Sequence, residues 1–257
     1  MPEAPLPLAK SVAHAGSGWA RRWPAPCVVC HGWCTGGLYS ACVTRFAAQQ
    51  PRCARCGLRL AEAGSPCGAC SLHGPPMVRT VVALDYAFPW DRLIARFKFA
   101  QAPELARVLV QPLIDHLGPQ LAAADELRPD LVLPVPLSPR RLRERGYNQA
   151  WELARRLARE LDLPAQADGL QRWRETPAQT TLDAAARRAN LRDAFMVNPQ
   201  LAGRLAGRHI ALADDVMTTG ATLAAAADLL LRNGAREVSA WALARTPTPS
   251  TGNRPSP

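Results

Sequence analysis

The chain has almost no lysine. Only Lys10 and Lys98 are lysine among its 31 basic residues, and the others are arginine. It also has no apolar run long enough to cross a bilayer, and Met1 to Pro26 lacks the continuous hydrophobic segment of a signal peptide. These absences argue against a membrane span and lead us to expect a cytoplasmic protein. No cysteine follows Cys70, so thiol chemistry is confined to the N-terminal part.

The charge balance is strongly basic, with a formal net charge of +10. Guanidinium groups bind phosphate in a bidentate way, so this balance favours a nucleic-acid or polyphosphate ligand. A genome rich in G and C, which encodes arginine in place of lysine, explains the composition equally well. At 257 residues the chain can hold one mid-sized domain and a small module.

The most informative stretch is His209 to Leu223, which reads HIALADDVMTTGATL. An apolar run up to Ala213 predicts a strand, and Asp214 and Asp215 follow it directly. From Ala221 onward the residues are almost all Ala or Leu, which favours a helix. The order is therefore a strand, two acids, a short loop and a helix.

That order predicts a sugar-phosphate site at the carboxyl end of a strand, where open α/β sheets bind ligands. The free N–H groups of the next helix attract an anion, Gly220 lets the backbone approach it, and three hydroxyls can donate to it. Asp214 and Asp215 would repel a phosphate, so they suit ribose hydroxyls or a magnesium ion. The predicted phosphate cradle consists of Thr218, Thr219, Gly220, Ala221 and Thr222.

This stretch resembles the signature of the type I phosphoribosyltransferases. In that family the loop holds the 5-phosphate of phosphoribosyl pyrophosphate (PRPP) and the acids hold its ribose, so the resemblance implies the same roles for Asp214, Asp215 and the threonine loop. The alternative is a capped strand–helix junction, with Thr219 as the N-cap and two solvated aspartates.

All eight cysteines lie in one short segment, and six of them form three Cys-x-x-Cys pairs. Without an export signal, such pairs indicate metal ligands and not disulfides. Cys53, Cys56, Cys67 and Cys70 form one complete four-thiolate set. The remaining four, Cys27, Cys30, Cys34 and Cys42, could form a second, with His31 as a possible substitute; a crossed pairing of Cys27/Cys30 with Cys53/Cys56 is also open.

The expected metal is zinc with a structural role. The segment has few large apolar residues, and binding of about 10–16 kcal/mol can supply the stability that its core lacks. Four sulfurs leave no open position for catalysis. Arg45, Arg52, Arg55 and Arg59 make this module basic, so it either contacts nucleic acid or serves only as a docking module.

A second basic segment follows the predicted strand Leu131 to Pro136. A loop from Leu137 to Gln149 carries Arg140, Arg143 and Arg145, which are suited to the pyrophosphate of PRPP, as is Lys98. The alternative is a solvated basic helix start. Further expected elements are strands at 80–87, 167–173 and 237–244 and helices at 90–99, 103–123 and 148–161.

Together these features resemble the ComF (ComFC/GntX-like) proteins. The matching residues are the cysteine module, Pro134-Val135-Pro136, Arg140, Arg145-Gly146-Tyr147-Asn148-Gln149, Thr176, Gln179, Arg187, Asn190 and the Asp214-Asp215 loop. The resemblance implies a PRPP- and magnesium-binding protein that acts in DNA uptake during natural transformation. Tyr39 stands where the family often has a cysteine.

We therefore expect an α/β fold of the type I phosphoribosyltransferase kind: a mainly parallel, twisted sheet flanked by helices, with a small cysteine-rich zinc module. The predicted division is a leader (1–26), the zinc module (27–76), the phosphoribosyltransferase-like domain (77–247) and a tail (248–257). The expected partners are PRPP, single-stranded DNA and the DNA-uptake machinery. Two other functions compete: a transferase of nucleotide metabolism that uses PRPP and magnesium, and a nucleic-acid-binding module whose PRPP site is vestigial.

Overall fold

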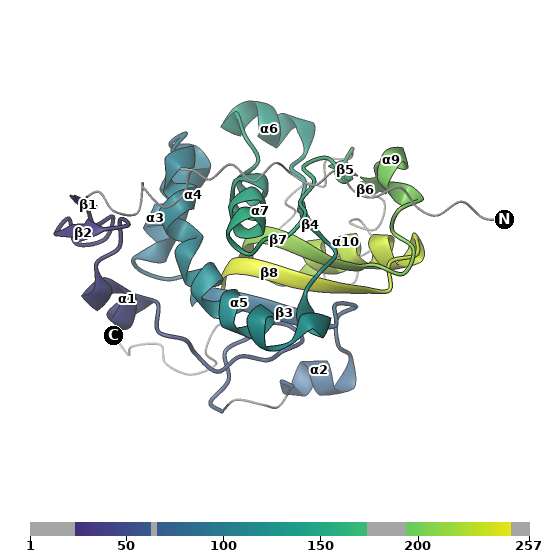
Figure 1. Ribbon diagram of the computed structural model, residues 1–257, viewed down its shortest axis with the longest axis horizontal. Helices are drawn as coiled ribbons and strands as arrows, with labels where there is room; N and C mark the ends of the chain where they lie inside the picture. The colour runs from purple at the N-terminus through teal and green to yellow at the C-terminus, as the bar shows by residue number, and fades with distance from the viewer. Residues whose placement is uncertain (1–23, 63–65, 174–193, 248–257) are drawn as a thin grey trace, which may run out of the picture.

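The computed structural model describes residues 24–62, 66–173 and 194–247. Its centre is a four-stranded sheet in which every neighbouring pair is parallel, in the order β3-β8-β7-β4 (Figure 1). The strands are β3 (Arg79–Asp85), β4 (Leu131–Pro134), β7 (His209–Met217) and β8 (Glu237–Arg245). Their sequences are nearly continuous apolar runs, because both faces of the sheet are covered and neither meets water.

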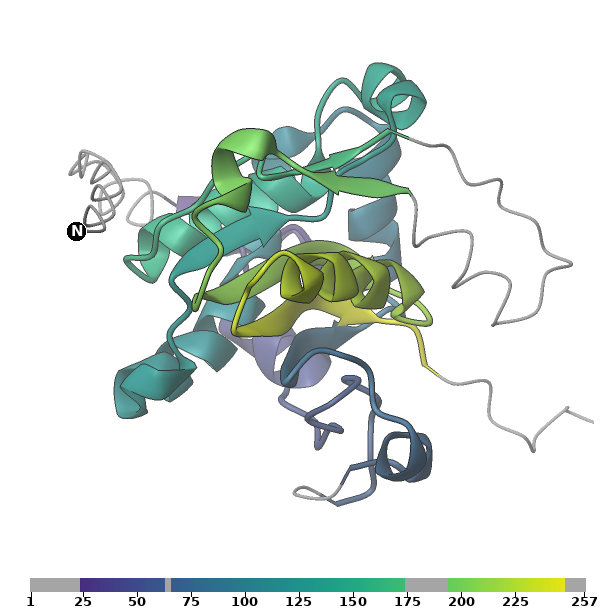
Figure 2. The same ribbon diagram turned by 90° about the vertical axis from the view of Figure 1, so that its right-hand side faces the viewer.

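Helices cover both faces of this sheet (Figures 1 and 2). One face packs against α3 (Trp90–Phe99), α4 (Ala106–Leu109), α5 (Gln111–Ala123) and α7 (Gln149–Glu160). The other face packs against α10 (Ala221–Arg232) and a small antiparallel pair, β5 (Leu170–Arg172) and β6 (Phe195–Val197), with α9 (Pro199–Ala202) beside it. The predicted fold class is confirmed.

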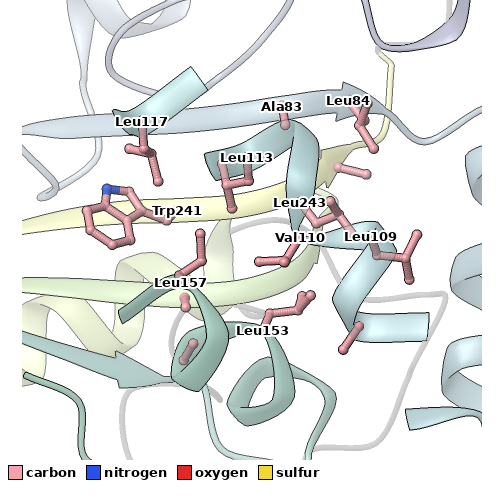
Figure 3. Packing of buried hydrophobic residues seen from close by; sticks show 14 of the residues in the cluster. Ala83, Leu84, Leu109, Val110, Leu113, Leu117, Leu153, Leu157, Trp241 and Leu243 are labelled. Carbon is pink, nitrogen blue, oxygen red and sulfur yellow. The ribbon is translucent and has the colours of Figure 1, made fainter. Parts of the chain in front are cut away.

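Trp241 is one of two tryptophans in the core between the sheet and helices α3, α4, α5 and α7, and it is only 2% exposed. Figure 3 shows it on β8, with Leu113 and Leu117 of α5 above it in the view and Leu157 of α7 below it. Because truncation of a buried tryptophan costs about 3–5 kcal/mol, this contact contributes substantially to holding α5 and α7 on the sheet.

The cysteine-rich part contains β1 (Pro24–Pro26), β2 (Trp33–Thr35), α1 (Ser40–Phe46) and α2 (Gly68–Leu72). It docks on β3 and α3 through its backbone carbonyls: Ala54 O accepts from Thr80 N of β3 at 2.7 Å, and Phe46 O accepts from the Trp90 Nε1 of α3 at 2.6 Å. Gly57, at φ +69°, lies so close to β3 that a Cβ there would be 2.4 Å from a Val82 methyl group. The domain boundary at residue 76 stays a prediction.

Three predicted elements differ from the structure. The helix expected at 103–123 is divided into a 3₁₀ turn (Pro103–Leu105), α4 and α5, because Pro112 has no N–H to continue the hydrogen-bond ladder. The strand expected to end at Ala213 continues to Met217. The segment expected to be a basic loop is mostly a helix, α6 (Pro139–Arg145), as described below. A second 3₁₀ turn, Asp125–Leu127, precedes β4.

Candidate functional site

The two adjacent acids lie inside β7, at the carboxyl edge of the sheet. Asp214 pairs in register with Ala242 of β8, and the strand continues for two more residues beyond Asp215. The prediction that the acids directly follow the strand is therefore wrong in detail. The reason is that β8 is equally long and provides backbone partners up to Met217. The acids still reach the ligand-binding edge, on a rigid strand and not on a loop.

Asp215 is 7% exposed and forms an ion pair with Lys98, whose Nζ lies 3.0 Å from Asp215 Oδ1. Asp214 is half-buried. Burial raises the pKa of Asp214 to about 7; the Asp215 carboxylate adds to the rise and Lys98 opposes it. The pair thus carries more negative charge than its one lysine neutralises, which suits hydroxyl donors or a divalent cation.

The threonine loop connects β7 to α10 as predicted. Gly220 is the N-cap of α10 and has φ +82°, a conformation that side chains rarely adopt. Thr219 Oγ1 accepts a hydrogen bond from Ala221 N at 3.3 Å. Thr218 and Thr219 are exposed, and Ala221 and Thr222 are half-buried at the start of the helix. The loop therefore presents hydroxyls and helix N–H groups three to seven residues beyond Asp215.

Helix α6 brings part of the predicted basic group to the same edge. Ser138 caps the helix by accepting from Arg141 N at 3.4 Å, and Pro139 occupies its first turn. Lys98 and Arg145 line one cavity of about 300 Å³, together with Arg141. Lys98 joins this cavity to the acid pair.

The other two predicted arginines do not line this cavity. Arg140 is paired with Glu144 at 3.4 Å, and Arg143 is exposed. Arg141 was missed by the sequence reasoning. Had the capping signal of Ser138-Pro139 been used, the spacing of Arg141 and Arg145 on one helix face would have identified both.

The run Arg145 to Gln149 connects these parts. Gly146, at φ +78°, ends α6, and the Tyr147 hydroxyl donates to Phe97 O in α3. Asn148 caps α7 and donates to Val135 O at 3.1 Å. Gln149 is buried and accepts from Arg145 at 2.9 Å. The run thus fixes Arg145 relative to α3 and β4.

The cysteines form two groups among the described residues. Cys53, Cys56, Cys67 and Cys70 have all their sulfur atoms within 4.8 Å of one another, and Cys56 Sγ lies 3.6 Å from Cys67 Sγ. Tetrahedral zinc with bonds of about 2.3 Å needs sulfurs about 3.8 Å apart, so this group fits the metal. The crossed pairing is not the one in the structure.

The other group contains Cys27, Cys30 and Cys42, and Cys34 lies outside it. Cys34 Sγ instead contacts Ala25 O at 3.5 Å across the β1–β2 pair. These three sulfurs fit a metal ion with one position left for a further ligand.

Backbone N–H groups stabilise the thiolate form in each group. Burial opposes ionisation of Cys53, but N–H donors, including Cys67 N at 3.3 Å, outweigh it and lower its pKa to about 6. Burial likewise opposes ionisation of Cys27, yet N–H donors, including Tyr39 N at 3.3 Å, lower its pKa to about 7. These donors favour the thiolate form, which is the form that binds a metal ion.

Arg245 connects the four-cysteine cluster to the phosphate loop. It stands at the end of β8, where Nε donates to Cys56 O at 3.2 Å and one terminal nitrogen donates to Met217 O at 3.1 Å. Met217 is the last residue before Thr218. One guanidinium thus ties the metal-binding turn to the strand end that carries the loop, a link with no signal in the sequence.

Four residues of the predicted family pattern, Thr176, Gln179, Arg187 and Asn190, lie outside the described residues. No helix in the described part of the chain combines the length and apolarity that a membrane crossing requires.

The family model of the phosphoribosyl transferase domain matches residues 148–251 of the sequence, which include the acid pair and the threonine loop. The chain is therefore a phosphoribosyltransferase-domain protein. Over most of its length it is similar to two curated proteins, and the chain belongs to their family, the ComF family. DNA utilization protein YhgH of Escherichia coli O157:H7 is 38% identical, and the aligned region covers 82% of this chain and 91% of YhgH. Competence protein F of Haemophilus influenzae is 35% identical, and the aligned region covers 85% of this chain and 96% of that protein.

Solved phosphoribosyltransferases also align with the chain. The purine phosphoribosyltransferase of Pyrococcus horikoshii is 18% identical over 58% of this chain and 92% of its own, with a TM-score of 0.33. The hypoxanthine enzyme of Trypanosoma cruzi is 11% identical over 57% and 76%, with a TM-score of 0.38.

Proposed function

We propose that this protein binds PRPP with magnesium at the carboxyl edge of β7 and acts in DNA uptake. Asp214 and Asp215 hold the ribose hydroxyls and the threonine loop holds the 5-phosphate. The observation that carries this proposal is that an acid pair, which one lysine neutralises only in part, lies on the strand that leads directly into a glycine-capped threonine loop. The names of the relatives, DNA utilization protein and competence protein F, support the DNA role.

The residues present fit a magnesium ion, because two adjacent carboxylates face one ammonium group and a hard divalent cation prefers oxygen ligands. When bound, magnesium neutralises the charge of the pyrophosphate. Arg145 and Lys98, with Arg141, are placed to bind the pyrophosphate in their shared cavity. Arg140 and Arg143 stay weaker candidates for the same role.

Zinc is proposed as a structural metal in both cysteine clusters. We also propose a cytoplasmic location, because cysteine clusters that bind a metal stay reduced in that compartment.

The test is a calorimetric titration of the full-length protein with PRPP and magnesium. Thr219→Ala removes a hydroxyl from the phosphate loop, so we expect the Kd to rise about tenfold, the equivalent of about one lost hydrogen bond to a charged group. Thr44→Ala, at an exposed position in α1, is the matched control and should bind as the wild type does. Equal affinities for all three proteins would contradict the proposed phosphate site.

A second candidate function is phosphoribosyl transfer to an acceptor, favoured by the basic cavity beside Asp215. In that reaction an acceptor nucleophile forms a bond to the ribose C1 while the bond from C1 to pyrophosphate breaks, and pyrophosphate leaves with the electron pair. Release of pyrophosphate from PRPP, followed across candidate acceptors, tests it. Turnover that is lost in Asp215→Asn supports a transferase; PRPP binding without turnover supports a binding protein.

A further inference from the structure

The outer face of α3 combines exposed aromatic rings with arginines. Arg92, Arg96 and Phe99 follow one another at spacings of four and three residues, which places them on one side of the helix. Both arginines are exposed, and Phe99 is 73% exposed. Phe88, just before the helix, is 60% exposed. We call Phe88, Arg92, Arg96 and Phe99 the α3 stripe.

Each exposed ring of the stripe has a guanidinium near one face. Arg92 Cζ lies 5.3 Å from the centre of the Phe88 ring, and Arg145 Cζ lies 5.1 Å from the centre of the Phe99 ring. Since more than half of each side chain is exposed, both rings still present surface to solvent. Exposed aromatic rings interleaved with arginines are the side chains on which the bases of single-stranded nucleic acids stack.

The surroundings of the stripe are basic at both ends. Near Phe88, a cavity of about 190 Å³ is lined by Arg45, Arg52 and Arg59, and its one carboxylate, Asp85, is already paired with Arg52 at 2.7 Å. Near Phe99 lies the 300 Å³ cavity with Lys98, Arg141 and Arg145 against Glu144. A ligand that spans the stripe therefore meets positive charge along its whole length.

We propose that the α3 stripe is a binding surface for single-stranded DNA. Unpaired bases can stack on Phe88 and Phe99, and the arginines between them contact the phosphates. A duplex hides the faces of its bases and cannot use the rings. This inference rests on the proposed function, since it identifies the DNA surface of a DNA-handling protein. The stripe ends at Phe99, next to Lys98, which contacts Asp215. A DNA strand bound along the stripe would therefore reach the proposed PRPP site.

The test is fluorescence anisotropy with a labelled dT₂₀ oligonucleotide and the full-length protein. We expect Phe88→Ala and Phe99→Ala each to weaken binding about tenfold, the usual cost of losing one stacked base. Arg92→Gln/Arg96→Gln should reduce the slope of log K against log salt by about 1.4, since each phosphate contact to a single strand contributes about 0.7.

The matched control is Arg204→Gln/Arg232→Gln, which removes the same charge at exposed positions away from α3 and should leave the affinity and the slope close to wild type. The proposal is overturned if the stripe variants bind dT₂₀ as the wild type does, if the control weakens binding equally, or if a duplex of the same length binds as tightly. Competition by polyglutamate as effective as that by unlabelled dT₂₀ would indicate an acidic protein partner instead.

PRPP titration of the same variants separates this inference from the proposed function. Phe99 lines the cavity proposed for the pyrophosphate, so the variants used here are Phe88→Ala and Arg92→Gln/Arg96→Gln; if they lose dT₂₀ binding but keep PRPP affinity, both proposals are supported. A wild type that binds dT₂₀ through the stripe and fails to bind PRPP would refute the proposed site alone. PRPP binding together with intact dT₂₀ binding by the stripe variants would refute the stripe alone.

Discussion

Arg245 provides a sharp test of how the metal-binding part and the phosphate loop depend on each other. Its guanidinium donates to Met217 O at 3.1 Å and to Cys56 O at 3.2 Å. Hydrogen bonds from a charged donor contribute about 1.5–3 kcal/mol each, and Arg245 is half-buried, so we use the lower end of that range. Arg245→Met should then destabilise the fold by about 3 kcal/mol.

Only the bond to Met217 bears on PRPP, because that residue directly precedes Thr218. Without this bond, the loop must be ordered when PRPP binds. If that ordering costs about 1.5 kcal/mol of binding free energy, the Kd for PRPP rises about tenfold. Arg245→Lys keeps the charge but has one nitrogen in place of the guanidinium fork, so it should restore one contact at most. Calorimetry with PRPP and magnesium measures the affinity, and zinc content is measured on the same samples.

Arg52→Met is the matched control. Arg52 also supports the four-cysteine cluster, by donating to Gly57 O at 3.3 Å, but its second contact is Asp85 on β3 and not β7. It should lower stability without changing PRPP affinity. If Arg245→Met lowers Tm yet binds PRPP like the wild type, Arg245 stabilises the fold only, and the link to the loop is refuted.

Three further predictions concern the acids, the cysteines and the Tyr147 contact. Burial and, to a smaller extent, the Asp215 carboxylate raise the pKa of Asp214 from 3.8 to about 7. Between these two pKa values the folded protein holds a proton that the unfolded chain releases. The free energy of unfolding should therefore fall by up to a few kcal/mol as pH rises from about 4 to 7, at about 1.4 kcal/mol per pKa unit. Urea denaturation of Asp214→Asn should lack this fall, and an identical pH profile would contradict it. Cys42→Ser should lose about one zinc per chain, whereas Cys34→Ser should keep it, since Cys34 lies outside the three-sulfur group; metal analysis distinguishes them. Tyr147→Phe removes the hydrogen bond to α3 and should cost about 0.5–1.5 kcal/mol in urea denaturation, and a variant as stable as the wild type would refute its role.

Local sequence determined much of the fold. Strands β3, β7 and β8 can be predicted from their apolar runs, because a strand that is buried on both faces is largely apolar. Helix α3 matches its prediction at 90–99 since its buried residues recur at helical spacing. The threonine loop with Gly220 was predictable for the same reason: its chemistry lies in consecutive residues.

Local sequence was less informative where a neighbour decides the outcome. Strand β7 continues through Asp214 and Asp215 because β8 offers it backbone partners, although two acids alone suggest the end of a strand. Helix α6 forms where the run of arginines predicts a loop, because Ser138 and Pro139 provide a helix start that the charge pattern does not reveal.

The residues of the candidate site can also be separated into those that local sequence predicts and those that only the tertiary structure brings together. The sequence by itself determined the acids, the threonine loop and the four-cysteine set, since these residues act with neighbours a few positions away. Only the tertiary structure brought Lys98 to Asp215, left Cys34 outside the three-cysteine group and placed Arg245 between Cys56 and Met217. Those contacts join residues far apart in the chain. Local propensity cannot predict which of the many arginines or cysteines the packing of the fold brings together.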